Sequence, residues 1–326
     1  MVRCARVPDI QRFRDRKRFF DGVRKFFDKK GFLEVDTPVV VPSPGLEPHL
    51  LAFETEFTTS KERNSSKLYL HTSPEYAMKR MLAHGAGDIY QIARVFRDEP
   101  ISNTHNPEFT MLEFYRCPGD LDMLMQDVKE FLFFIAEVVD GPWRPRDVEK
   151  ISVSDAFRRV GLCDPLGGIS TDHFRSALPI RTHEDDTWED LFHRAMFECV
   201  EPSFDPECPT ILYGYPASMA ALSRIDPNDQ SRCLRFEVFA GSLELGNAFD
   251  ELVDPVLQRE RFVEENDLRK KLGRPSYPID EDLVEDLGQI ADASGIAIGL
   301  DRLLMLCLGK DRLSEVLSFP PEMEGN

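Results

Sequence analysis

Two arginines and two glutamates in this chain have side chains suited to a nucleotide's phosphates. Arg97 and Arg302 each carry a guanidinium, which can donate two parallel hydrogen bonds to phosphate oxygens. Glu244 and Glu251 supply carboxylates, which can bind a divalent metal while the ion keeps several waters. These residue types predict activation of a nucleoside triphosphate, with Mg²⁺ as the metal.

A second group of residues could hold an amino group. If residues 109–115 form a strand, alternation places Phe109, Met111, Glu113 and Tyr115 on one face. A carboxylate beside a phenol is a plausible receptor for an ammonium ion. Small residues in the segment 295–299 would let a flat or phosphorylated ligand approach the backbone.

Each of these segments is weak evidence on its own. An arginine and a glutamate two residues apart, such as Arg97 and Glu99, are commonly a surface pair. Glu244 and Glu251 are seven residues apart, which puts them on opposite faces of an unbroken strand. Binding one ion together therefore requires a bulge or bend, which we expect at residues 246–247. The prediction of a site depends on the combination of segments.

The hydrophobic pattern predicts the elements that must position these residues. Residues 10–30 have helical periodicity, and Gly31 is a natural stop. Residues 88–97 and 108–116 form the two strands of an expected hairpin, joined by a long polar loop of the kind that carries function. The other expected elements are strands at 32–35, 50–58, 68–70, 210–215, 234–240 and 243–249, helices at 73–84 and 255–272, and a strand running into a helix at 295–308. Residues 118–205 predict a mostly helical insertion, and the whole pattern indicates an α+β fold.

Composition narrows the class of protein. The 326 residues contain 40 Lys and Arg against 58 Asp and Glu, a net charge of −18, which disfavours a protein that grips long nucleic acids. Seven cysteines without a C-x-x-C pair argue against a disulfide framework and fit a reducing cytoplasm. The most apolar run is far shorter than the about 20 residues of a bilayer span, so we expect no membrane segment.

Three segments together resemble the class II aminoacyl-tRNA synthetases. Residues 96–115 resemble motif 2, residues 295–302 resemble motif 3, and residues 244–252 resemble the acidic strand between them. Two further segments are similar in sequence to the lysyl branch: residues 105–113, His-Asn-Pro-Glu-Phe-Thr-Met-Leu-Glu, and residues 72–75, Thr-Ser-Pro-Glu. Residues 31–38 resemble motif 1, the helix–strand unit of the dimer interface, so the resemblance implies a homodimer. It covers about residues 9–320.

Within that branch the chain is similar to a standalone catalytic core. We expect one class II synthetase-like catalytic domain over residues 1–326, an antiparallel sheet flanked by helices with the insertion at 118–205, and no N-terminal OB-fold for anticodon binding. This organisation resembles the elongation factor P–(R)-β-lysine ligase family, which activates (R)-β-lysine with ATP and transfers it to a lysine of elongation factor P. Motif 3 has Ala297 where lysyl-tRNA synthetases typically have glycine, as in the ligases. One methyl group discriminates by ~10–200-fold, enough to bias the pocket against α-lysine.

The resemblance also implies roles for individual residues. Arg97 and Arg302 would be the catalytic residues, because they stabilise charge on the phosphates. The implied ATP-binding residues are Arg97, Asp98, Glu99, His105, Asn106, Phe109, Glu244, Leu245, Gly299 and Arg302. The implied substrate-binding residues are Ser73, Pro74, Glu75, Glu113, Tyr115, Asn247, Glu251 and Ala297. Glu244 and Glu251 would hold Mg²⁺.

Other interpretations stay open. The chain departs from the family at Asp98, where asparagine is usual, and at residues 102–104, where many relatives place an arginine before the histidine. One phosphate contact is therefore missing or supplied by His105. A truncated lysyl-tRNA synthetase, a lysine-adenylating enzyme and a non-catalytic paralogue remain as alternatives, and Ala297 could be ordinary strand packing. Transfer to tRNA is not expected of so acidic a chain.

Overall fold

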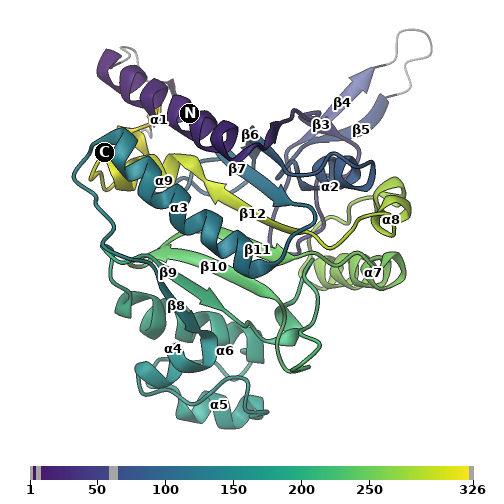
Figure 1. Cartoon of the computed structure of the whole chain (residues 1–326). Helices are drawn as coiled ribbons and strands as arrows, with labels where there is room; N and C mark the ends of the chain where they lie inside the picture. Colours follow the sequence, from purple (N-terminus) through teal and green to yellow (C-terminus); the bar gives the residue numbers. More distant parts are fainter. Residues whose placement is uncertain (1–2, 5–8, 59–64, 323–326) are drawn as a thin grey trace.

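An eight-stranded sheet forms the centre of the computed structural model, which describes residues 3–4, 9–58 and 65–322. Its strands run in the order β2-β6-β7-β12-β11-β10-β9-β8 (Figure 1). Their bounds are β2 Leu33–Glu34, β6 Ile89–Phe96, β7 Glu108–Arg116, β8 Glu149–Ser152, β9 Thr210–Tyr213, β10 Arg235–Ala240, β11 Leu243–Asp250 and β12 Ser294–Gly299. The two outer pairs, β2 with β6 and β8 with β9, are parallel, and the five inner pairs are antiparallel. The expected α+β fold with an antiparallel sheet is confirmed.

Three helices cover one face of this sheet and bury the main core. They are α1 Ile10–Lys30, α3 Leu121–Val139 and α9 Leu300–Cys307 (Figure 1). Helix α1 begins at an N-cap aspartate, Asp9, and ends at Gly31, whose φ of 78° is the left-handed conformation that glycine adopts without strain. The expected helix at 10–30 and its stop are confirmed. Phe27 of α1 stacks on Tyr90 of β6, which joins the helix to the sheet.

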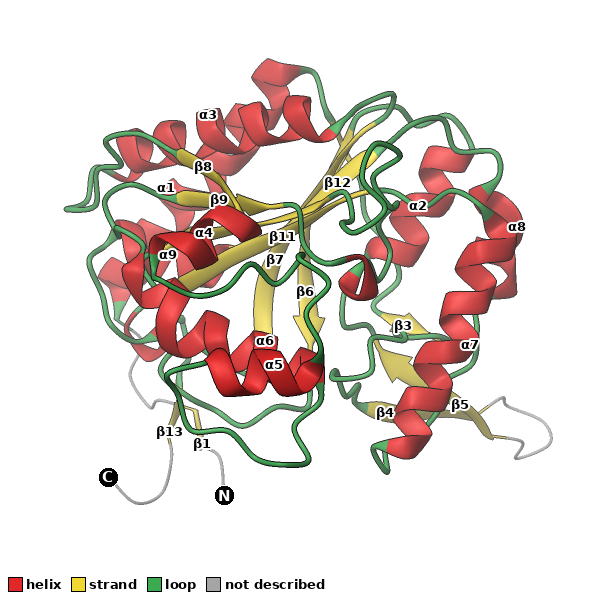
Figure 2. Ribbon diagram, turned by 90° about the horizontal axis from the view of Figure 1, so that it is seen from below, coloured by secondary structure: helices red, strands yellow, loops and turns green. Residues whose placement is uncertain are grey.

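The segment 118–205 is divided between the main domain and a helical lobe. Helix α3 contributes to the main core and β8 extends the central sheet, so this part is not a separate insertion. The lobe consists of α4 Val153–Arg159, α5 Thr171–Ala177, α6 Trp188–Ala195, a π-helical turn at Met196–Val200 and a 3-10 turn at Glu201–Ser203. It has its own apolar cluster, which packs on residues of β9 and β10 (Figure 2).

A third group of elements lies at the other end of the sheet. A small sheet has the order β3-β5-β4, with bounds β3 Val40–Val41, β4 Glu54–Thr58 and β5 Ser65–Leu70. Helices α2 Glu75–Ala83, α7 Pro255–Lys271 and α8 Glu281–Leu287 pack beside it around a separate apolar cluster (Figure 2). The remaining described pieces are β1 Arg3–Cys4, β13 Pro321–Glu322 and 3-10 turns at Ala217–Met219 and Leu313–Glu315. Within the described ranges no helix is long and apolar enough to cross a bilayer.

Candidate active site

Adjacent strands bring three predicted residues into one row across the sheet. Ala297 of β12 pairs with Glu113 of β7 on one side and with Asn247 of β11 on the other. Paired residues on neighbouring strands point to the same face. This face is opposite the one that α1, α3 and α9 cover, because Leu112 and Ile296, the neighbours of Glu113 and Ala297, belong to the main core. The predicted alternation along residues 109–115 is confirmed.

A bulge in β11 brings Glu244 to the same face. Val238 of β10 pairs with Gly246 and Phe239 pairs with Glu244, so Leu245 has no partner and is the extra residue. The bulge lies next to the expected position, residues 246–247. Leu245 itself is buried in the main core, so only its backbone can face a ligand.

Glu244 and Glu251 lie far apart along the strand, and their joint binding of one Mg²⁺ stays a prediction. The bulge turns Glu244 to the same face of the sheet as Asn247. Seven residues of strand still separate the backbones of Glu244 and Glu251 by about 20 Å. Two ligands of one Mg²⁺ lie within about 4 Å of each other, since each Mg–O bond is about 2.1 Å. Glu251 instead contacts a lysine, with 2.5 Å between Oε2 and Lys79 Nζ. The sequence pattern located the strand but not the distance along it.

Glu237 of β10 is a carboxylate that the sequence reasoning missed. It pairs with Asn247 and therefore shares the face of Glu244. Burial and then the carboxylates of Glu237 and Glu244 raise the pKa of Glu201 to about 7, which places the three acids near one another. Tyr215 Oη and Arg235 Nη2 each donate to Glu237, at 2.7 and 2.5 Å. The signal in the sequence was the spacing of seven between residues 237 and 244, which spans two strands of a hairpin.

Arg97 has a buried side-chain donor without a hydrogen-bond partner among the described residues. It follows β6, and its backbone N–H donates to Pro107 O at 2.9 Å, which closes the loop 97–107. Its guanidinium lies 5.3 Å from the centre of the Phe109 ring. Its Nε is buried and has no hydrogen-bond partner in the described part of the chain. An orphaned guanidinium donor fits a site for an anion.

Arg302 joins β11 to the same loop. Its guanidinium donates to Thr104 O at 3.1 Å and to Glu244 O at 2.8 Å, and lies 2.9 Å from His105 Nε2. Burial and then the Arg302 charge lower the pKa of His105, so the imidazole is neutral and its Nε2 can accept this hydrogen bond. The structure thus brings both predicted arginines and His105 to one end of the sheet.

The other predicted nucleotide residues take different positions around this end. Asp98 and Glu99 form the turn after β6, where their N–H groups donate to Leu51 O and Arg97 O. Asn106 donates its side-chain amide to Glu108 O at 2.5 Å. A Cβ added at Gly299 would contact Arg302 only at ordinary distances, 3.7 Å or more, so the fold itself does not require this glycine.

Glu113 belongs to a second cluster of charged residues on this face, together with Glu75, Lys79 and Glu251. Tyr115 Oη donates to Glu113 Oε1 at 2.5 Å and Ser73 Oγ donates to Oε2 at 2.6 Å. Burial and then the Glu75 carboxylate raise the pKa of Glu113 to about 8. Pro74 is the N-cap residue of α2, and the N–H of Glu75 donates to Ser73 Oγ at 3.0 Å.

Lys79 is a second residue that the sequence reasoning missed. It is fully buried, and its Nζ lies 2.6 Å from Glu75 Oε1 and 2.5 Å from Glu251 Oε2. Burial alone would lower its pKa, but Glu251 and Glu75 raise it above the ordinary value, so Lys79 is charged. Glu75, Glu113 and Glu251 with Lys79 give two excess negative charges when all are ionised, which matches a substrate with two ammonium groups. The sequence signal was the i, i+4 spacing of Glu75 and Lys79.

The comparisons with known proteins agree with this geometry. The family model described as "tRNA synthetases class II (D, K and N)" matches residues 2–323. The chain is 39% identical over 320 residues to the elongation factor P–(R)-β-lysine ligase of Salmonella arizonae, covering 97% of this chain and 95% of that protein. It is 38% identical, with the same coverage, to the ligase of the same name from Salmonella paratyphi A. The chain belongs to the elongation factor P–(R)-β-lysine ligase family, which has the class II synthetase domain.

Membership in this ligase family confirms the resemblance and the fold, and implies ATP as a co-substrate. Arg97 lies in the segment that resembles motif 2, and Arg302 lies in the segment that resembles motif 3. In the structure these two motifs meet through the Arg302–His105 contact, although about 200 residues separate them in the chain.

Proposed function

We propose that this chain activates (R)-β-lysine with ATP and transfers it to a lysine side chain of elongation factor P. The observation that carries the proposal is the arrangement of charge on one sheet face. An orphaned guanidinium at Arg97 lies at one end, and a buried cluster of carboxylates around Lys79 lies at the other. A diamino acid presents the complementary pattern, with one carboxylate and two ammonium groups. The names of the two relatives supply the substrate and the acceptor.

The first step needs no nucleophilic side chain. A carboxylate oxygen of (R)-β-lysine attacks the α-phosphorus of ATP, the bond to the β-phosphate oxygen breaks, and pyrophosphate leaves. Arg97 would hold the substrate carboxylate against the α-phosphate, and Arg302 would bind the γ-phosphate. Phe109, already in contact with Arg97, would stack on the adenine. Catalysis is positioning and charge stabilisation.

In the second step the acceptor amine attacks the carbonyl carbon of the adenylate. An amide bond forms, the bond to the AMP phosphate oxygen breaks, and AMP leaves with the amine's proton transferred to solvent or phosphate. Glu75, Tyr115 and Glu251 would hold the two amino groups and Asn247 the carboxylate during both steps. The methyl group of Ala297 would favour the amino group one carbon further from the carboxylate.

Glu237 and Glu244 fit a Mg²⁺ site better than Glu244 and Glu251. They lie on one face of adjacent strands, and a carboxylate has lone pairs left after two hydrogen bonds. Mg²⁺ is commonly held by one or two carboxylates together with substrate phosphates, and it would neutralise charge on the leaving pyrophosphate.

We also propose that the enzyme works as a homodimer in the cytoplasm. Leu33, Val39 and Val40 are exposed apolar residues on or beside β2 and β3, in and next to the motif 1 segment. Exposed apolar residues that gather at a sheet edge are typical of a protein interface.

The test is the intact mass of elongation factor P after incubation with this enzyme, ATP and Mg²⁺. Parallel reactions contain (R)-β-lysine or α-lysine. A gain of one β-lysyl unit, with little gain from α-lysine, is the expected result. No gain in either reaction, with active ATP–pyrophosphate exchange, would contradict the proposed acceptor and make tRNA the next one to assay.

A further inference from the structure

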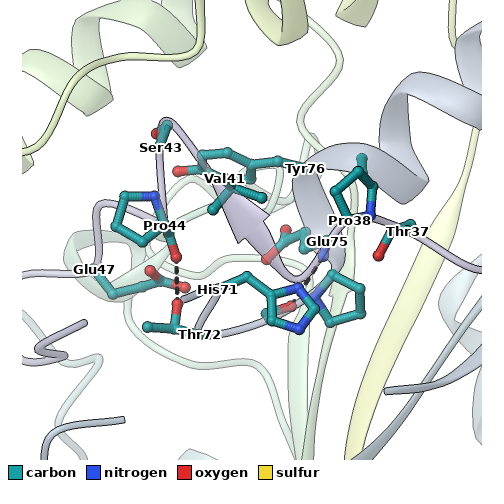
Figure 3. Close-up of a pocket in the computed structure, with 14 residues that line it drawn as sticks. Thr37, Pro38, Val41, Ser43, Pro44, Glu47, His71, Thr72, Glu75 and Tyr76 are labelled. Carbon is teal, nitrogen blue, oxygen red and sulfur yellow. Dashed lines mark hydrogen bonds between the residues drawn. The ribbon is translucent and has the colours of Figure 1, made fainter. Parts of the chain in front are cut away.

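A small cavity lies beside the amino-binding cluster, which is the group of Glu75, Glu113, Glu251 and Lys79. The roles proposed so far do not use this cavity. Its volume is about 20 Å³, and segments 37–47 and 71–77 line it (Figure 3). A volume of about 10–15 Å³ is enough for one water molecule, so the cavity has room for a group of that size, such as an ammonium. Glu75 contributes to its wall and also contacts Lys79, so the cavity borders the charged cluster around Lys79.

Glu47 places a carboxylate in this cavity. In Figure 3 its side chain lies beside Thr72. Its Oε2 is buried and has no hydrogen-bond partner in the described part of the chain. A buried carboxylate oxygen without a partner is costly, and such groups occur where a ligand completes the site.

Gly45 leaves space for the Glu47 carboxylate, because it has no side chain. An added Cβ there would lie 2.8 Å from Glu47 Oε2 and 3.0 Å from Thr72 Oγ1. Its φ of 109° is also a conformation that other residues rarely adopt. The loop therefore needs glycine at this position, and it holds the Glu47 carboxylate against the cavity.

The charges around Glu47 come from three elements. Burial and then the Glu75 carboxylate raise the pKa of Glu47, whereas Arg97 and Lys79 lower it. Glu265 of α7 is the other acid nearby, since burial and then Glu47 raise its pKa to about 8. Glu47 is thus near both Arg97, the proposed holder of the substrate carboxylate, and Glu75. An amino group on a carbon near that carboxylate would meet this position.

We propose that Glu47, together with Glu75, binds the substrate amino group that lies nearer to the substrate carboxylate. This inference rests on the proposed function, which supplies a substrate with two amino groups. Tyr115 and Glu251 bind the far amino group, and Glu47 makes the site select diamino acids over amino acids that have only the far group.

The fold does not depend on the Glu47 side chain. The backbone carbonyl of Glu47, and not its carboxylate, accepts the hydrogen bond from Arg269 Nη1 at 2.7 Å. The same carbonyl accepts from the N–H of Leu50 at 3.1 Å. Glu47→Gln keeps these bonds and the size of the side chain, and it removes only the negative charge.

Calorimetric titration with two ligands tests the proposal. 6-Aminohexanoate has the carboxylate, the six-carbon chain and the terminal amino group of (R)-β-lysine, but it lacks the amino group at the third carbon. We expect Glu47→Gln to raise the Kd of (R)-β-lysine by about 10–100-fold, the usual effect of losing a charge-assisted hydrogen bond. The Kd of 6-aminohexanoate should stay within about twofold, and Glu47→Asp should restore part of the affinity for (R)-β-lysine.

Two control variants complete the experiment. Glu265→Gln changes a nearby acid in the same way, but its side chain does not line the cavity, so both Kd values should stay nearly unchanged. Glu251→Gln should weaken both ligands, because both carry the far amino group. Equal weakening of both ligands by Glu47→Gln, or the same selective loss in Glu265→Gln, would overturn the proposal. If the wild-type enzyme adds no mass to elongation factor P and binds neither ligand, the proposed function is wrong instead, and this inference fails with it.

Discussion

At the scale of single residues, the site is a pair of charge patterns separated along one sheet face. Arg97, Arg302 and His105 lie at one end, and the cluster around Lys79 lies at the other. The two ends differ in the charged groups that they present. At the first end the buried Arg97 Nε has no hydrogen-bond partner among the described residues, whereas the second end has more carboxylates than cations. Such a site selects a ligand by the positions of its charges.

Ala297 should set the preference between β- and α-lysine. Its side chain lies between Glu113 and Asn247 in the row across the sheet. Ala297→Gly removes one methyl group, so we expect use of α-lysine to rise by about 10-fold or more, within the ~10–200-fold range of a methyl-sized difference. ATP–pyrophosphate exchange with each amino acid measures this. An unchanged preference would return Ala297 to ordinary strand packing.

Affinity for the diamino acid should increase with pH. The pKa of Glu113 in the free enzyme is about 8, so the carboxyl is protonated at pH 6 and must ionise beside an ammonium group. We expect Kd to fall by up to about tenfold per pH unit between pH 6 and 8, with proton release on binding. Titrations in buffers of different ionisation enthalpy measure the protons released.

The raised pKa of Glu113 gives the free energy of unfolding the opposite pH dependence. Between the ordinary carboxyl pKa and 8, the folded chain binds a proton that the unfolded chain has lost, so the Glu113 contribution to stability is lost as pH rises through this window. Glu113→Gln should weaken both pH dependences, and Glu251, whose pKa burial also raises to about 8, accounts for the part that remains. A pH dependence of Kd as steep as that of the wild type would contradict the role of Glu113.

Glu237 should control the Mg²⁺ requirement. Glu237→Gln leaves Glu244 as the one remaining carboxylate of the proposed pair, so we expect the Mg²⁺ concentration for half-maximal pyrophosphate exchange to rise several-fold. Glu251→Gln is the matched control, because Glu251 contacts Lys79 about 20 Å of strand away from Glu244. This control should raise the KM for the amino acid and leave the Mg²⁺ dependence unchanged.

At the scale of elements, buried polar contacts fix how the helices meet the sheet. Asp301 begins α9 and accepts hydrogen bonds from Arg16 Nη1 of α1 at 2.7 Å and from the Thr110 N–H of β7 at 2.6 Å. Both side chains of the ion pair are buried. Arg302, the next residue, projects to the site face. One aspartate therefore sets the orientation of the helix that carries the motif 3 arginine.

Breaking this ion pair should destabilise the fold. Arg16→Met leaves the Asp301 carboxylate buried without its cation, so we expect a loss of about 3–5 kcal/mol in the free energy of unfolding. Urea denaturation measures it. Arg24→Met breaks an exposed pair with Glu34 on the same helix and should cost less than about 1 kcal/mol. Similar losses in the two variants would contradict a special role for the buried pair.

At the scale of the whole molecule, different elements pack at the two ends of the central sheet. The helical lobe packs on β9 and β10, and the elements α2, α7 and α8 lie beside the amino-binding cluster. The exposed apolar residues of the proposed dimer edge, Leu33, Val39 and Val40, lie on or beside β2 and β3.

A charge at this edge should dissociate the proposed dimer. Val40 is 46% exposed, so Val40→Asp costs little in a monomer but would place an unpaired carboxylate in an apolar interface. We expect analytical ultracentrifugation to show a monomer for Val40→Asp and a dimer for the wild type. Val256→Asp on α7, at a residue that is 68% exposed, is the control and should stay dimeric.

Much of the fold followed from local patterns. The helix at 10–30, the hairpin of 88–97 with 108–116 and the strand before Arg302 depend on periodicity and on caps such as Gly31, which act within a few residues. The place of segment 118–205 in the fold was harder to predict. Helix α3 would be amphipathic whether it packed on the main core or in a separate insertion. Only its packing on α1 shows that it belongs to the main core.

The sequence by itself determined the class of fold, the two arginines and the acidic strand, because these depend on residue type and short spacing. The tertiary structure decided which acids act together. It paired Glu237 with the face of Glu244, placed Glu251 on Lys79 and left Glu47 unpartnered in a cavity. The physical reason is that strand register and one bulge set distances between residues far apart in the chain, and charges interact through those distances and through burial.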